Sequence, residues 1–334
     1  MLGFDSNNLT DGDFRFWARR PAIFQANALY LLAAAGIPAV PYALVFVASL
    51  FGARLSDQTA LVATSFVYYP LLVGLPIFRY AWKREGVSRA LRLNPLTPGM
   101  AVVSVLAALA GVMTALSVGS LWLLALEGMG ARLIDQTLPT ADTTGQLVTL
   151  VLTSCMLPGI FEELLFRGFI LGAWERRGTK YALVVSTVMF AGLHGSITGL
   201  PTQILLGFAI GYLVVNTDSL YAGMIYHTAH NFALVMLSQY QRGAANAGQT
   251  LYESAGGAAG VLLLALQALV YGGIFIAILA VSDWRREKQG RTFEQIERID
   301  LTPLGWQELL VLLAAGITVG SMYLMDLLRM MRVI

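Results

Sequence analysis

Long apolar stretches, separated by short polar ones, follow each other from about residue 24 to residue 328. Stretches of about 18 or more apolar residues are typical of helices that cross a lipid bilayer. The pattern predicts nine helices, of which the fifth and sixth are short, at 24–52, 58–78, 99–126, 145–174, 181–196, 200–216, 219–240, 257–281 and 306–328. We therefore expect an all-α fold, a polytopic transmembrane helical bundle of eight or nine spans.

The composition agrees with a protein embedded in a lipid bilayer. Of the 334 residues, 57% are hydrophobic and 13% are charged, whereas soluble domains carry roughly 25% charged residues. The polar first 20 residues do not resemble a cleaved signal peptide. The single cysteine, Cys155, lies in an apolar stretch and excludes a disulfide framework or a cysteine-based metal cluster. Because the basic residues lie in short loops, we expect no nucleic-acid partner.

The distribution of lysine and arginine predicts the orientation in the membrane. With the N-terminus in the cytoplasm, most of these residues fall in cytoplasmic loops, as the positive-inside rule requires. An odd number of spans then places the C-terminus outside, although Arg329 and Arg332 lie there against the rule. We expect a multi-pass membrane protein with a cytoplasmic N-terminus and an external C-terminus.

Three longer polar stretches divide the chain. Residues 127–144 are expected to form an external loop and residues 283–305 an amphipathic cytoplasmic loop, and 241–256 forms the third. The predicted parts are an N-terminal region of about three spans, a middle part of about four and a C-terminal region of about two, at 1–144, 145–240 and 241–334.

The middle part places ionisable residues inside apolar spans. A charge at the centre of a bilayer costs roughly 2.5–3.5 kcal/mol on insertion scales, so such residues are functional candidates. Three of them lie in the string FEELLFR, namely Glu162, Glu163 and Arg167. All three histidines of the chain follow, with His194 ending FAGLH and with His227 and His230 in HTAHN, which Asn231 closes.

Helical spacing sorts these residues by face. Glu163 and Arg167 are four residues apart and can form an ion pair that neutralises both charges. Glu162 is rotated by about 100° from Glu163 and points elsewhere. His227 and Asn231 share a face in the same way.

Several of these residues have simpler interpretations. His194 and Asn231 are alternatively groups that hydrogen-bond between helices. His230 is turned away from Asn231, and we interpret it as structural. Gly207 and Gly211 form a GxxxG pattern that favours close helix packing over chemistry.

A carboxylate, imidazoles and an amide in a buried pocket suit the hydrolysis of a peptide bond. Glu162 would take a proton from water as general base, and His194 would hold or polarise that water. His227 and Asn231 would donate hydrogen bonds to the oxyanion. The sequence has no GxSxG elbow and no HExxH helix, so serine hydrolase and ordinary zincin mechanisms are unsupported.

The motifs EExxxR, FxxxH and HxxxN, in this order on separate spans at 162–167, 190–194 and 227–231, resemble those of the CPBP family. This family includes the type II CAAX prenyl endopeptidases and the bacterial Abi-like proteins, and the resemblance covers about residues 145–240. It implies an intramembrane endopeptidase for prenylated CAAX-type or other membrane-associated substrates. It also implies a helical bundle with a cavity open towards the cytosol and the bilayer.

The resemblance implies the same roles for the four residues named above, and supporting roles for Glu163, Arg167 and Phe190. Its relatives are described as metalloproteases, in which Glu162, His194 and His227 would bind zinc, or as metal-free glutamate proteases. We favour the metal-free mechanism and assign no cofactor, with zinc as the alternative. His230 lies outside the motifs and receives no catalytic role.

Two other functions compete with a protease. A proton- or ion-coupled transporter would distribute its ionisable groups along a path across the membrane. Here the groups are expected at one level on three spans, which favours a site. A catalytically silent membrane scaffold would tolerate Glu162→Gln, and the complete motif set argues against it.

Overall fold

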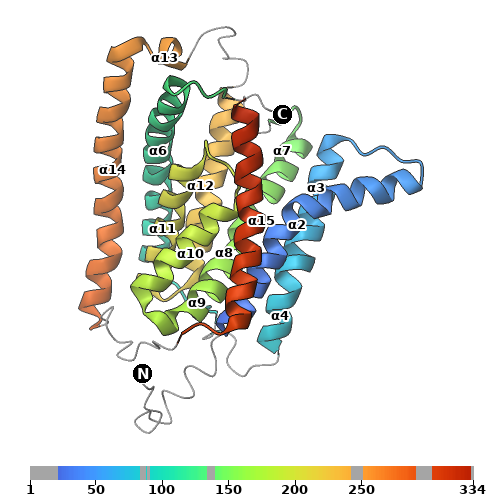
Figure 1. The fold of residues 1–334 in the computed structure, drawn as a ribbon. Helices are drawn as coiled ribbons and strands as arrows, with labels where there is room; N and C mark the ends of the chain where they lie inside the picture. Colours follow the sequence, from blue (N-terminus) through green and yellow to red (C-terminus); the bar gives the residue numbers. More distant parts are fainter. Residues whose placement is uncertain are drawn as a thin grey trace.

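The computed structural model describes residues 22–82, 88, 91–133, 140–241, 251–290 and 303–331, and these residues contain helices and no strand. Figure 1 shows that the long helices run side by side as a bundle. The first part contains α2 (Ile23–Leu50), α3 (Asp57–Val67), the π-helix η2 (Tyr68–Gly74), α4 (Leu75–Trp82) and α6 (Pro98–Gly128). The all-α helical bundle expected from the sequence is confirmed.

The middle part begins with one continuous helical segment, in which α-helical and π-helical stretches alternate. It consists of α7 (Thr144–Val151), the π-helix η3 (Leu152–Met156), α8 (Leu157–Glu163), the π-helix η4 (Leu164–Ile170), α9 (Leu171–Trp174) and a 3₁₀ turn (Glu175–Arg177). It continues through α10 (Thr179–Leu193), α11 (Leu200–Thr217) and α12 (Leu220–Tyr240). The last part contains α13 (Leu251–Ser254), α14 (Gly257–Lys288) and α15 (Trp306–Met330).

All nine predicted segments are helical, but two of them fall short of a full apolar span. Seven helical segments of the described chain are long and apolar enough to cross a membrane. α10 has only 15 residues, fewer than the roughly 20 that a spanning helix needs. α12 is long enough, but it carries the two histidines and Asn231 and is not among the seven. The two exceptions are therefore helices that present motif residues.

The end of α10 lies part-way along the bundle. The predicted span 181–196 is too long at this end, because α10 stops at Leu193 and His194 is its C-terminal cap. The short loop from there to α11 lies below the upper ends of α6 and α14 in Figure 1. His194 is thus placed within the depth of the bundle.

α2 bends near Pro38 and Pro41, which lie inside the helix. A proline removes a backbone hydrogen bond and clashes with the preceding turn, so it kinks a helix. The second half of α2 leaves the bundle and projects sideways (Figure 1), and its Tyr42 and Phe46 are exposed. This arm is apolar, as a segment in contact with lipid would be.

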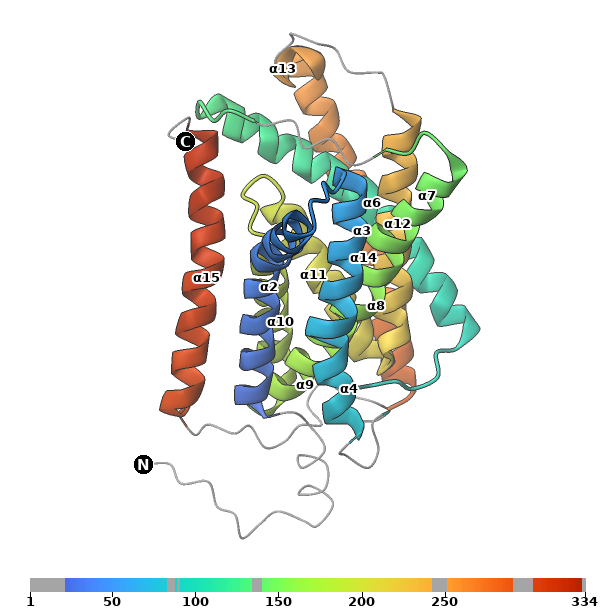
Figure 2. The same ribbon diagram turned by 90° about the vertical axis from the view of Figure 1, so that its right-hand side faces the viewer.

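The central helices of the bundle carry its core. α11 packs against both α10 and α12, and α6 lies against α12. α14 lies at the outside of the bundle in Figure 1, and α15 does so in Figure 2. The largest fully buried side chains include Phe166, Phe190, Ile210 and Tyr226, and also Arg167. A fully buried arginine within this apolar core requires a partner.

Two predicted loops are partly helical. α14 continues to Lys288, so residues 283–288 belong to a helix and not to the expected loop. Its last turn carries Arg285, Arg286 and Lys288, and cations are favourable at the C-terminal end of a helix dipole. Within the predicted loop 241–256, residues 251–254 form α13.

The ends of the described chain lie at opposite ends of the bundle. α2 begins at the end where α6 begins and α14 finishes, whereas α15 finishes at the other (Figures 1 and 2). Arg92, Arg177 and Arg285 lie at the former end. Residues 1–20, Arg332 and most of the loop 283–305 fall outside the described residues, so the predicted cytoplasmic and external sides stay predictions, as do the three domain boundaries.

Candidate active site

Two π-helical stretches flank the paired glutamates. The N–H of Leu157 bonds to the carbonyl of Leu152, five residues back, just before Pro158. Proline has no N–H of its own to donate, and here a π-helical turn lies directly before Pro158. Such turns occur often at functional sites. The short α8 between the two stretches ends in Glu162 and Glu163.

Glu163 joins two other motif residues. Its Oε1 accepts hydrogen bonds from Arg167 Nη1 at 2.7 Å and from His227 Nδ1 at 2.8 Å. Both side chains of the Glu163–Arg167 pair are fully buried, which confirms the predicted ion pair. Arg167 Nη2 donates to the carbonyl oxygen of Gly207 at 2.7 Å, and the guanidinium carbon lies 4.6 Å from the centroid of the Phe190 ring. The buried charges are thus matched by partners.

Small residues let α12 approach the paired glutamates. A Cβ atom added at Gly223 would lie 2.9 Å from Glu163 Oε2, and one added at Gly159 would lie 2.2 Å from Thr228 Oγ1. Neither position has space for a larger residue. This close approach of α8 and α12 brings His227 to Glu163.

Glu162 points away from the partners of Glu163. Its Oε1 accepts a hydrogen bond from Tyr69 Oη at 2.8 Å. Its Oε2 is buried and has no hydrogen-bond partner in the part of the chain that the structure describes. Tyr69 belongs to η2 and stacks on Phe161, with ring centroids 6.1 Å apart. Glu162 is therefore held inside the protein with one oxygen available to a water molecule or a substrate.

His194 lies beside Phe190 at the end of α10. Its Nδ1 is 2.9 Å from the Phe190 carbonyl oxygen, and the two ring centroids are 4.9 Å apart. The Phe190 ring also contacts the His227 ring, at a centroid distance of 5.8 Å. Phe190, a supporting residue by resemblance, thus contacts both motif histidines and Arg167. His194 itself is exposed.

Helices outside the motifs hold the loop after His194. Asp326 Oδ2, on α15, accepts a hydrogen bond from the Ile197 N–H at 2.7 Å, and Trp122 Nε1, on α6, donates to the Ile197 carbonyl oxygen at 2.8 Å. Tyr323 Oη donates to the Ala191 carbonyl at 2.9 Å. These contacts fix the position of His194 from two sides.

Asn231 and His230 each contact a neighbouring helix. Asn231 Nδ2 donates to the carbonyl oxygen of Ser154, in η3, at 3.0 Å, so it does hydrogen-bond between helices. One N–H of its amide remains for another acceptor. His230 is buried, stacks parallel to Tyr226 and faces Ala108 of α6. His230 takes no part in the contacts described above between residues of the three motifs.

A zinc site would need three ligands close together. Among the described residues, no group of three His, Cys, Asp or Glu side chains is placed to hold a metal ion. Glu162, His194 and His227 do not form such a group among the described residues. Both motif histidines, His194 and His227, have Nδ1 bonded to a carbonyl or carboxylate oxygen, so Nε2 is the ring nitrogen that these bonds do not use.

Tyr69 was not predicted from the sequence, because nothing distinguishes it from other aromatic residues in apolar spans. We expect Tyr69→Phe to lower kcat by about tenfold. The variant removes the charge-assisted hydrogen bond, worth about 1.5–3 kcal/mol, that orients the Glu162 carboxylate. Initial cleavage rates at saturating substrate would measure this. Unchanged kcat would show that Glu162 is oriented without Tyr69.

Asp326 tests the support of His194 from α15. Replacing Asp326 by alanine leaves the Ile197 N–H without its acceptor, and we expect about a tenfold loss of kcat/KM from a mispositioned His194. Ser321→Ala, in an exposed position of the same helix, is the matched control. Equal activity of both variants would contradict a positioning role for Asp326.

One comparison with known proteins matches this part of the chain. Residues 144–233 match the sequence model of the family described as type II CAAX prenyl endopeptidase Rce1-like. The match runs from the start of α7 into α12 and contains all three motifs. Comparisons with curated proteins and with solved structures gave no match. Residues 144–233 of this multi-pass membrane protein are therefore similar to the Rce1-like family of type II CAAX prenyl endopeptidases.

Proposed function

We propose that this protein is an intramembrane endopeptidase that cleaves a peptide bond in prenylated CAAX-type or other membrane-associated substrates. The main support is the environment of Glu162. Its carboxylate is buried, Tyr69 holds one oxygen, and the other oxygen has no partner in the described chain. Direct contacts join Glu163 to Arg167 and His227, and Phe190 links His227 to His194. Such a cluster favours a reaction site over a transport path.

Glu162 acts as general base in this proposal. A water molecule gives a proton to Glu162 Oε2, and its oxygen attacks the carbonyl carbon of the scissile peptide bond. The Phe190 carbonyl can only accept a hydrogen bond, so Nδ1 of His194 carries the hydrogen. Nε2 of the neutral His194 ring is then an acceptor that orients the water.

His227 needs a second proton to stabilise an oxyanion. Its Nδ1 donates to the Glu163 carboxylate, so Nε2 of a neutral ring has a lone pair and cannot donate. With an imidazolium at His227, the charges of Glu162, Glu163 and Arg167 are balanced, as a buried site requires. Nε2–H of His227 and the second N–H of Asn231 then donate to the oxyanion.

The second half of the reaction returns the site to its starting state. The tetrahedral intermediate collapses as the peptide C–N bond breaks. Glu162, which holds the proton taken from water, gives it to the leaving nitrogen and becomes a carboxylate again. Water is consumed, and the products are a carboxylic acid and an amine.

Cleavage of a defined peptide would test the proposal. The full chain in nanodiscs should hydrolyse a farnesylated CAAX peptide, with products identified by mass spectrometry. Should that peptide stay intact, the membrane proteomes of cells with the protein and with its Glu162→Gln variant would be compared. The absence of any Glu162-dependent product in both assays would refute the protease.

Metal removal is tested on the same sample. We expect cleavage to continue at an unchanged rate after dialysis against a strong chelator, with metal analysis showing less than one metal ion for each chain. Loss of activity that only added zinc restores would overturn the metal-free mechanism. It would leave the peptidase assignment in place.

The orientation in the membrane is part of the proposal. The end of the bundle with Arg92, Arg177 and Arg285 faces the cytoplasm, as the positive-inside rule favours. In a Cys155→Ala background, a cysteine at exposed Gln289 should react with a membrane-impermeant maleimide only after the cells are opened. Labelling of intact cells would reverse the orientation.

A further inference from the structure

A polar cavity of about 410 Å³ lies at one end of the bundle, where α6 begins and α11 and α14 finish. Its volume falls within the roughly 300–1,000 Å³ of small-molecule sites. No residue of the three motifs lines it. Its lining comes from the loop before α6, the α11–α12 turn and the end of α14, and includes Asn94, Thr97, Asn216, Asp218, Ser282 and Arg285.

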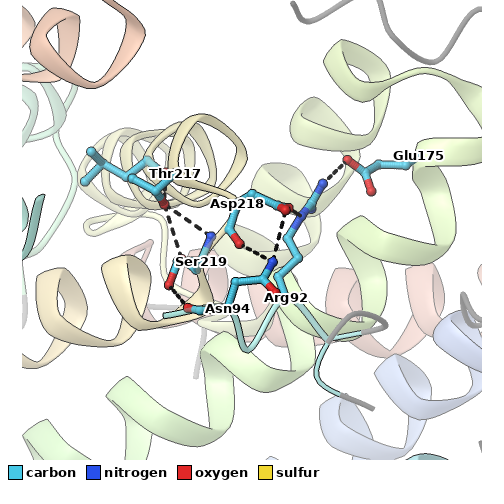
Figure 3. Close-up of polar contacts among 7 residues, drawn as sticks. Arg92, Asn94, Glu175, Thr217, Asp218 and Ser219 are labelled. Carbon is cyan, nitrogen blue, oxygen red and sulfur yellow. Dashed lines mark hydrogen bonds and ion pairs between the residues drawn. The ribbon is translucent and has the colours of Figure 1, made fainter. Parts of the chain in front are cut away.

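A network of hydrogen bonds fixes one wall of this cavity (Figure 3). Arg92 Nε and Asn94 Nδ2 donate to the two carboxylate oxygens of Asp218, each at 3.0 Å, and Arg92 also pairs with Glu175. Ser219 Oγ donates to the Asn94 carbonyl oxygen at 2.6 Å. Although burial lowers the pKa of Arg92, Glu175 and Asp218 outweigh that effect and raise it above its usual value. The network therefore holds this wall in place, and Arg92 stays charged.

The same wall presents acceptors that suit a ligand with N–H groups. Asn216 is 2% exposed, and its Nδ2 donates to Ser282 Oγ at 2.9 Å. Its Oδ1 is buried and has no hydrogen-bond partner in the described chain. Buried polar atoms are nearly always paired, so this oxygen points to a missing donor. The neighbouring Asp218 carboxylate, 41% exposed, is a second acceptor.

Another part of the lining suits an anion. α6 begins at Pro98, its cap residue Thr97 makes no side-chain capping bond, and the first N–H groups of a helix attract phosphate. Arg285 lies over this helix start, with Nη1 3.6 Å from a Cβ atom added at Gly99. Arg285 has no side-chain hydrogen bond or ion pair within the described part of the chain.

The cavity lies at a membrane boundary. Next to Arg285, the Trp284 side chain is 56% exposed, and Lys288 Nζ lies 4.1 Å from the centroid of its ring. Tryptophan and basic residues in this arrangement are typical of the headgroup level of a bilayer. Nearer the start of α14 than Trp284, Ile276 and Val281 are exposed apolar residues. A lipid can therefore lie along α14 with its headgroup at the cavity.

We propose that this cavity binds the headgroup of a phospholipid that carries a phosphate and a primary ammonium, as in phosphatidylethanolamine. The phosphate contacts Arg285 and the start of α6. The ammonium donates hydrogen bonds to Asn216 Oδ1 and to Asp218. A choline headgroup has the same charge but no N–H, so the free Asn216 oxygen distinguishes between the two.

Lipid selectivity of the full chain tests this site. In mixed nanodiscs of phosphatidylethanolamine, phosphatidylcholine and phosphatidylglycerol, native mass spectrometry after release would count the lipids that stay bound. We expect phosphatidylethanolamine to be retained about tenfold over phosphatidylcholine, the ratio for one charge-assisted hydrogen bond. Equal retention of these two, or preference for phosphatidylglycerol, would overturn the proposal.

Variants and a soluble headgroup complete the test. Asn216→Leu should abolish the preference, and Arg285→Gln should lower the retention of both zwitterionic lipids, whereas Lys288→Gln, outside the lining, should change neither. Arg285 is partly exposed, so its variant is expected to fold even if Asn216→Leu does not. Soluble glycerophosphoethanolamine should not compete at millimolar concentration. Competition by it would assign the site to a free phosphate ester, and unaltered retention of phosphatidylethanolamine in Arg285→Gln would refute the site.

Discussion

The Glu162→Gln variant is expected to lose about 10²–10⁴-fold in kcat, the usual contribution of a general base. The amide is close in shape to the carboxylate and can still accept the hydrogen bond from Tyr69 Oη. It cannot take a proton from water. Cleavage of the farnesylated peptide in nanodiscs, at equal protein concentration, would measure the loss.

The loss of kcat in Glu162→Gln can be attributed to the chemical step only if folding and substrate binding stay unchanged. The Glu162→Gln protein should have the thermal unfolding midpoint of the parent, and it should bind the uncleaved peptide with the same Kd. Glu287→Gln, on an exposed position of α14, is the matched control and should be fully active. Full activity of Glu162→Gln would disprove the assigned base, whatever the effects of His194→Ala and His227→Ala.

Predictions from the spacing of residues along a single helix agree with the structure. Glu163 and Arg167 pair as expected from their i, i+4 separation, because local geometry alone decides that contact. Gly207 and Gly211 pack closely against α10, as a GxxxG pattern predicts, with added Cβ atoms 3.0 Å from Phe190 and 2.4 Å from Leu183. Apolar runs likewise located the helices, since lipid demands them.

Contacts between distant segments could not be predicted in this way. Tyr69 and Glu162 are separated by 93 residues, and Asp326 and Ile197 by 129. The residues that surround Tyr69 and Asp326 in the sequence do not distinguish them from other polar residues at such positions. The bond of His227 to Glu163, which couples the first motif to the third, also depends on how α8 and α12 pack.

Arg167 connects folding to the site. Its guanidinium is the positive partner of Glu163, bonds to the Gly207 carbonyl and covers the Phe190 ring. Glu163 in turn holds His227, and Phe190 contacts both motif histidines. A single buried charge thus links groups on four helices, α8, α10, α11 and α12.

Arg167→Ala is accordingly expected to destabilise the protein by about 3–5 kcal/mol, because Glu163 is left as an uncompensated buried charge. Its yield and thermal unfolding midpoint in detergent should both fall, together with activity. Lys288→Ala, an exposed basic residue, should leave all three unchanged. An Arg167→Ala protein as stable and active as the parent would contradict the pairing.

The double variant Glu163→Gln/Arg167→Met separates the charge from the catalytic effect. Replacing both members of a buried ion pair by uncharged residues of similar volume is often close to neutral for stability. We therefore expect the unfolding midpoint to recover most of the loss seen in Arg167→Ala. Activity should stay low, since an uncharged residue 163 cannot hold His227 as an imidazolium. A double variant as unstable as Arg167→Ala would show that packing of the arginine, and not its charge, maintains the fold.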